Sequence, residues 1–94
     1  MNADLVEKTE RYGEMLSSAM EIVEIAPRKD PPLGSAAEEC IVMANSYLED
    51  GKIFLENGDY VNSLAAFSYG YGWVDAGVRF GLLIAPGDTD LFSV

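Results

Sequence analysis

The chain has 94 residues, with six Lys or Arg against sixteen Asp or Glu and a formal net charge of −10. This balance argues against nucleic-acid binding, which needs a basic surface, and against binding to anionic membranes. His is absent and Cys40 is the single cysteine, which excludes a His-based catalytic triad and an intrachain disulfide. The N-terminal segment MNADLVEKTERYGE lacks the apolar stretch of a signal peptide, so we expect a cytoplasmic protein without a cofactor.

Residues 3–26 are expected to form an amphipathic helix, because one stripe of residues recurs at intervals of four and three. That stripe comprises Leu5, Thr9, Tyr12, Leu16, Ala19, Val23 and Ala26. Asp4 and Glu7 have the spacing of a capping box at its start. The segment 27–34, PRKDPPLG, is expected to be a linker, since three prolines and a glycine do not continue a helix.

A second helix is expected over residues 35–57, where Ser35 and Glu38 have capping-box spacing. Its buried stripe is predicted to be Ala37, Ile41, Ala44, Leu48, Gly51 and Leu55. Gly58 suits the left-handed cap of this helix, and Asp59 suits the N-cap of the next. A turn this short makes the second and third helices antiparallel neighbours.

The third helix is expected over residues 59–85 and to remain continuous through Gly70 and Gly72, with a kink there as the alternative. The residues after Pro86 show no helical period and predict an irregular tail. Three of them, Leu91, Phe92 and Val94, either fold back onto the bundle or belong to a frayed end. No strand is expected, so the prediction for residues 1–94 is a single all-α domain, an up-down-up three-helix bundle.

Small residues form one stripe of the third helix, and bulky residues form another. Ala66, Gly70, Gly77 and Gly81 recur at helical spacing, which favours close packing of a neighbouring helix. A helix that is apolar nearly all round must be covered on several sides. We therefore expect a protein partner or a homodimer over part of this helix, with coverage by the C-terminal tail as the alternative.

Asp75 and Arg79 are the only charged residues between Asp59 and Asp88. Four residues apart, with the acid first, they have the preferred spacing of an intrahelical ion pair. The same two residues could instead contact a ligand or partner, with an aromatic wall beside them. That wall would consist of Tyr69, Tyr71 and Trp73.

Metal binding is the alternative for the acidic residues. Glu21 and Glu24 have the E-x-x-E spacing of Mg²⁺-dependent all-α nucleotide pyrophosphatases, and Glu49 with Asp50 could complete such a cluster. The simpler interpretation is that these acidic residues form a solvent-exposed row of charges. We therefore assign no metal ligand and no catalytic residue.

The chain resembles an uncharacterised archaeal family, domain of unknown function 357. The residues that carry the resemblance are Tyr47, Asp50, Gly51, Phe54, Gly58-Asp59-Tyr60 and the segment SYGYGWVDAGVR, residues 68–79. The resemblance implies a small helical-bundle protein and no established activity.

Taken together, the sequence predicts a non-enzymatic helical module for protein interaction or oligomerisation. Two alternatives remain at this point: a Mg²⁺- or Mn²⁺-dependent hydrolase, and a small-ligand binder beside Trp73.

Overall fold

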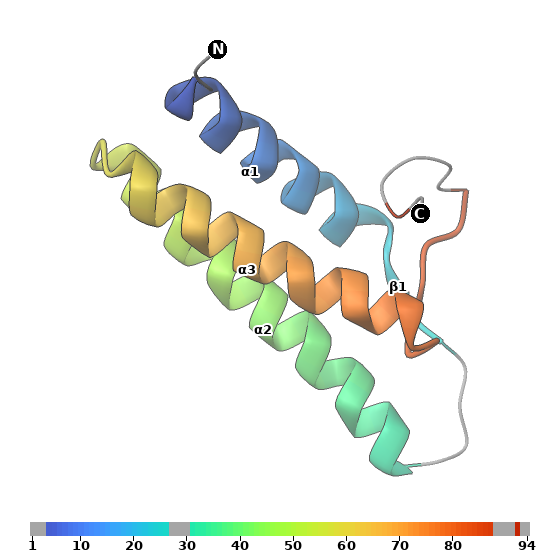
Figure 1. Ribbon diagram of the computed structural model, residues 1–94. Helices are drawn as coiled ribbons and strands as arrows, with labels where there is room; N and C mark the ends of the chain where they lie inside the picture. The colour runs from blue at the N-terminus through green and yellow to red at the C-terminus, as the bar shows by residue number, and fades with distance from the viewer. Residues whose placement is uncertain (1–3, 27–30, 88–91, 93–94) are drawn as a thin grey trace.

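Three helices form the chain in a computed structural model that describes residues 4–26, 31–87 and 92. They are α1 (Leu5–Ile22), α2 (Pro31–Glu56) and α3 (Tyr60–Arg79). Two short strands, β1 (Glu24–Ile25) and β2 (Leu83–Ile84), pair with each other at one end of the bundle. The expected all-α, up-down-up bundle is confirmed, and Figure 1 shows α1 and α3 running together with α2 antiparallel to them.

The central element is α3, which packs against both other helices, whereas α1 and α2 contact each other much less. The core lies along this axis and is built from ten buried residues: Leu16, Ala19, Ala37, Cys40, Ala44, Leu48, Phe67, Val74, Leu82 and Leu83. Its largest member, Phe67, fits between α1 and α2 because both present a glycine to its ring. A Cβ at Gly13 would lie 2.8 Å from Phe67 Cε2, and one at Gly51 would overlap the ring.

Local signals predicted the helix starts at two places. The Asp4 carboxylate accepts a hydrogen bond from the Glu7 amide at 3.1 Å, which caps α1. Asp59 caps α3 by accepting from the Asn62 amide at 3.2 Å. Gly58 has φ +74°, and the amides of Gly58 and Asp59 donate back into α2, so the expected left-handed cap is confirmed.

The second helix begins four residues before the expected start at Ser35. Pro31 and Pro32 begin α2 because the N–H groups of a first helical turn have no acceptor within the helix. Proline, which lacks the N–H, therefore loses no hydrogen bond there. The expected linker over 27–34 is therefore shorter, and its residues 27–30 lie outside the described part.

The first helix, expected over residues 3–26, ends at Ile22, and the expectation that no strand forms is wrong. Glu24 pairs with Ile84 and Ile25 with Leu83, in antiparallel register. Ala26 precedes a proline, which disfavours helical backbone, and its amide donates to the Leu82 carbonyl at 2.9 Å.

The third helix, expected to reach residue 85, ends at Arg79 and is continuous through Gly70 and Gly72. Gly81 has φ +76°, its amide donates to the Val78 carbonyl, and the next amide donates to the Gly77 carbonyl. This Schellman motif ends the helix and turns the chain into β2.

From the C-terminal tail the structure describes Phe92, whose ring stacks on Tyr71 with centroids 5.6 Å apart. Leu91 and Val94, which the sequence also placed on the bundle, lie outside the described residues. In the described part of the chain, no helix is both long enough and apolar enough to cross a membrane.

Candidate functional site: an aromatic face on helices two and three

Aromatic side chains from two helices meet on the side of the bundle that α1 does not cover. The rings of Tyr47 in α2 and Tyr69 in α3 contact edge to face, with centroids 4.6 Å apart. Tyr69 continues to Trp73, one turn along α3, at 6.5 Å and again edge to face. Such T-shaped contacts are favourable for aromatic pairs, so they order the three rings into one row.

Helical spacing extends this row in both directions. On α3, Tyr69, Trp73 and Phe80 stand at i, i+4 and i+11, on one stripe. On α2, Met43 lies one turn before Tyr47. We call these five residues, Met43, Tyr47, Tyr69, Trp73 and Phe80, the aromatic face.

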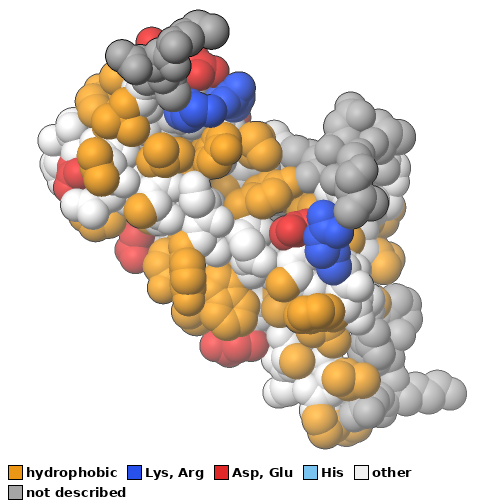
Figure 2. All heavy atoms as spheres, viewed as in Figure 1, with side chains coloured by type: hydrophobic (Ala, Val, Ile, Leu, Met, Phe, Trp, Pro, Cys, Tyr) orange, Lys and Arg blue, Asp and Glu red, His pale blue; other side chains and the backbone are white. Residues whose placement is uncertain are grey.

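The aromatic face is open to solvent to an unusual degree for its residue types. Tyr69 is 56% exposed and Phe80 is 74% exposed, while Met43, Tyr47 and Trp73 are half-buried. Figure 2 shows hydrophobic side chains gathered along the edge formed by α2 and α3, with acidic side chains at their border. Large exposed aromatic residues in a contiguous group mark interaction sites more often than scattered apolar residues do.

A shallow hollow of about 310 Å³ lies on the solvent side of α3, within this face. Its lining consists of Ser68, Tyr69, Gly72, Trp73 and Ala76. Gly72 forms the floor, and nothing lies within 4 Å of the position that its Cβ would take. An apolar side chain from outside therefore finds walls of aromatic carbon and a floor of small residues.

The sequence placed five residues in one contact site, and the structure divides them. Tyr69 and Trp73 belong to the aromatic face, but Tyr71, roughly 200° around the helix from Tyr69, faces α1. There it borders a second hollow with Tyr12, Met15 and Ser68. The expectation of one continuous aromatic wall is therefore replaced by two separate surfaces.

Asp75 and Arg79 form an ion pair with each other. The Arg79 Nε donates to both carboxylate oxygens of Asp75, at 3.1 and 3.2 Å. Both side chains are partly exposed, on the flank of α3 away from Trp73. The pair satisfies its own charges, so it offers the aromatic face no free cation.

The predicted small-residue stripe of α3 points inward. A Cβ at Gly70 would lie 2.9 Å from Leu16 Cδ2 and 3.3 Å from the Ala44 carbonyl oxygen, so both neighbouring helices come close there. Ala66 and Gly77 are also buried, and Gly77 packs on Leu83 and Cys40. Gly81 does not belong to the stripe, because α3 has already ended and this residue is exposed.

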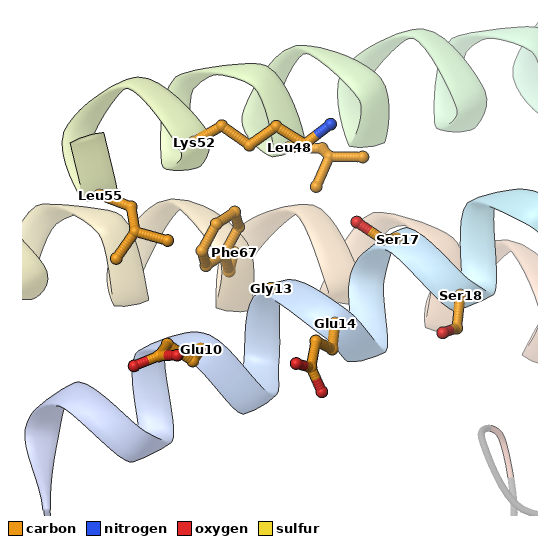
Figure 3. A pocket seen from close by; sticks show the side chains of 9 residues that line it. All are labelled: Glu10, Gly13, Glu14, Ser17, Ser18, Leu48, Lys52, Leu55 and Phe67. Carbon is orange, nitrogen blue, oxygen red and sulfur yellow. The ribbon is translucent and has the colours of Figure 1, made fainter.

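A third hollow lies between α1 and α2, where these helices separate over Phe67 (Figure 3). Its volume is about 350 Å³, and its lining consists of Glu10, Gly13, Glu14, Ser17, Ser18, Leu48, Lys52, Leu55 and Phe67. Leu48, Leu55 and Phe67 turn into the space, whereas the Glu14 carboxylate points away from α2. Lys52 pairs with Glu49 at 3.5 Å. The hollow thus has a bed of apolar side chains with polar residues of α1 and Lys52 along its sides.

Metal binding gains no support from the geometry. Within the described residues, no three His, Cys, Asp or Glu side chains gather where they could hold an ion. Glu21, Glu24, Glu49 and Asp50 are all described and stay dispersed on the surface. Cys40 is buried, and that burial, with the Glu39 charge as a second cause, raises the pKa of its thiol, so it remains protonated and inert.

Three members of the aromatic face, Met43, Tyr47 and Phe80, are not among the contact residues that the sequence predicts. Phe80 falls within the longer helix expected over residues 59–85. The i, i+4, i+7, i+11 recurrence of Tyr69, Trp73, Ala76 and Phe80 is the sequence signal that could have identified the outer stripe.

The fold and this surface define a class: small three-helix proteins that expose aromatic side chains along one helix pair. The chain belongs to the family described as a protein of unknown function (DUF357), whose model matches residues 11–83. The match begins within α1, covers α2 and α3 and ends within β2. No curated protein and no solved structure matches the chain.

Proposed function

We propose that this chain is a non-enzymatic protein-interaction module that contacts its partner through the aromatic face. The observation that carries the proposal is the exposure of Tyr69 and Phe80 on a stripe that also holds Trp73. Tyr, Trp, Phe and Met are the residues enriched at protein interfaces, and Tyr and Trp dominate binding energy when a partner covers them. The partner is either another protein or a second copy of the chain.

A protein surface fits the site better than a small ligand does. Small-molecule sites are concave and enclose most of the ligand, with a few polar groups converging on it. The hollow beside Trp73 is shallow, and the polar side-chain groups of its lining residues are the hydroxyls of Ser68 and Tyr69 and the indole N–H of Trp73. A single cysteine, which cannot form an intrachain disulfide, suits a reducing compartment, so we place the interaction in the cytoplasm.

Site-specific photocrosslinking tests the proposal in the cell that makes the protein. The photoreactive residue p-benzoylphenylalanine replaces Tyr69 in one variant, Phe80 in a second and Val42 in a third. Val42 is a matched control, because it is 54% exposed but lies on another face of α2. We expect a discrete adduct of defined mass from positions 69 and 80 and none from position 42.

Adding Trp73→Ala to the variant with p-benzoylphenylalanine at position 80 tests whether the adduct depends on the aromatic face. It is expected to abolish crosslinking from position 80 while the chain stays folded, as judged by circular dichroism. If positions 69 and 80 yield no discrete adduct, or if position 42 yields the same one, the aromatic face is not the contact surface.

A further inference from the structure

The shape of the aromatic face suits a helix. Phe80, the C-cap of α3, follows Tyr69 by eleven residue steps, a rise of about 16 Å at 1.5 Å per residue, or three turns. A docked helix presents apolar side chains at i, i+3 or i+4, and i+7 over a similar length, and one of them fits the hollow above Gly72. An extended strand fits poorly, because the helices beneath have their backbone groups paired and leave a strand's amides without partners.

The border of the face is acidic. Glu39 and Asp50 lie on the same stripe of α2 as Met43 and Tyr47, at i, i+11, i+4 and i+8. Both carboxylates are exposed, and neither has an ion pair within the described residues. The row of aromatic side chains thus lies beside two negative charges that no described residue neutralises.

The basic residues of the described part are engaged elsewhere. Arg11 pairs with Glu7, Lys52 with Glu49, and Arg79 with Asp75, each on its own helix. Lys8 lies 6.0 Å from the centroid of the Tyr12 ring on α1. The chain therefore supplies no described cation to its own aromatic face.

These charges disfavour a second copy as the occupant. Each copy carries a net charge of −10, and a symmetric contact brings the Glu39 and Asp50 carboxylates of both copies to one interface. Like charges facing each other across an interface weaken association. A cationic partner instead neutralises the border and places its Lys or Arg groups over the faces of Tyr69 and Trp73.

Resting on the proposed function, we infer that the partner presents an amphipathic helix whose apolar stripe is flanked by Lys or Arg. Its apolar side chains cover Tyr69, Trp73 and Phe80. Its cations meet Glu39 and Asp50.

Three synthetic helical peptides test this inference with Trp73, the single tryptophan of the chain, as the reporter. They share one leucine stripe and carry Lys, Gln or Glu on the flanks, without Trp or Tyr. We expect the Lys peptide to bind at least about tenfold more tightly than the Gln peptide, and the Glu peptide not to bind. Raising salt from about 0.1 M to about 1 M, which shortens the screening length from about 10 Å to about 3 Å, should remove most of this difference.

A pair of charge-matched double variants locates the effect. Glu39→Gln with Asp50→Asn should weaken the Lys peptide about fivefold and leave the Gln peptide unchanged. Glu14→Gln with Glu38→Gln removes the same net charge from other surfaces, Glu14 being at the hollow between α1 and α2, and should leave both affinities unchanged.

Equal affinity for the Lys and Gln peptides overturns the basic partner, and so does the absence of binding by all three. If the Glu14 and Glu38 double variant weakens binding of the Lys peptide more than the Glu39 and Asp50 double variant does, the contact is not at Glu39 and Asp50. A self-dimer in light scattering that Trp73→Ala dissolves identifies a second copy as the occupant and also overturns the inference. None of these results touches the proposed function, which the photocrosslinks from positions 69 and 80 decide.

Discussion

The inner and outer faces of α3 contain the same kinds of residue, glycine and aromatic, in opposite roles. On the inner face Gly70 admits two neighbouring helices, and Phe67 fills the space that glycines of α1 and α2 leave open. On the outer face Gly72 touches nothing, and Tyr69 stands in solvent beside Trp73. A glycine or an aromatic ring therefore takes part in core packing on one side of α3 and in an exposed surface on the other.

The largest expected effect separates the aromatic residues of the two faces. Phe67→Ala empties the centre of the core and should lower the free energy of unfolding by about 3–5 kcal/mol, close to the whole stability of a small domain. Tyr69→Ala removes two ring contacts at the surface, each worth about 0.5–1.5 kcal/mol, but gains helix propensity, so it should cost about 1–2 kcal/mol. Urea denaturation followed by circular dichroism measures both, and similar losses would contradict the division into an inner and an outer face.

Glycine-to-alanine changes two residues apart on α3 should have opposite signs. Gly70→Ala places a methyl group 3.0 Å from Tyr47 Cβ and against the Ala44 carbonyl, so overpacking should outweigh the helix propensity gained, with a net loss of about 1–2 kcal/mol. Gly72→Ala meets open space and should raise stability by about 1 kcal/mol. Thermal unfolding of the two variants checks the signs, and a stabilising Gly70→Ala would contradict the close approach.

Burial of the Cys40 thiol, which lies in α2 against Gly77 on the inner face of α3, predicts that stability depends on pH. Burial raises the pKa of Cys40 above its ordinary value of 9.0, so the unfolded chain loses this proton first as pH rises. The contribution of the thiol to stability is complete below pH 9.0 and is lost as pH rises towards the folded pKa.

The control for the thiol is Cys40→Ala. The free energy of unfolding of the natural chain should fall more steeply above pH 9.0 than that of this variant, measured by urea denaturation at each pH. Parallel slopes would show that Cys40 titrates alike in both states.

The smallest effect is expected on the flank between the faces. Asp75→Asn removes a partly exposed ion pair within one helix and should cost about 0.3–0.5 kcal/mol at low salt. The loss should vanish in about 1 M salt, where exposed pairs are screened. A loss above about 1 kcal/mol that persists in salt would place the pair in the core instead.

Much of the architecture follows from local pattern. Asp4, Gly58 and Asp59 mark helix ends by side-chain or backbone preferences that act within a few residues, so they were predictable. The continuity of α3 through Gly70 and Gly72 was predictable as well, because small residues at helical spacing indicate packing. The candidate site was predictable only in part: Tyr69 and Trp73 were predicted as contact residues, whereas Met43, Tyr47 and Phe80 were not.

The sequence by itself determined the number, order and direction of the helices, because periodicity, caps and a short turn are local properties. Only the tertiary structure decided that the chain forms β1 after α1 and β2 after α3, since these strands are 58 residues apart at closest and form only by pairing with each other. It also decided which side of α3 is covered. Residues of the small stripe and the bulky residues Phe67 and Val74 are buried, and the positions of α1 and α2 leave the side with Tyr69, Trp73 and Phe80 open to a partner.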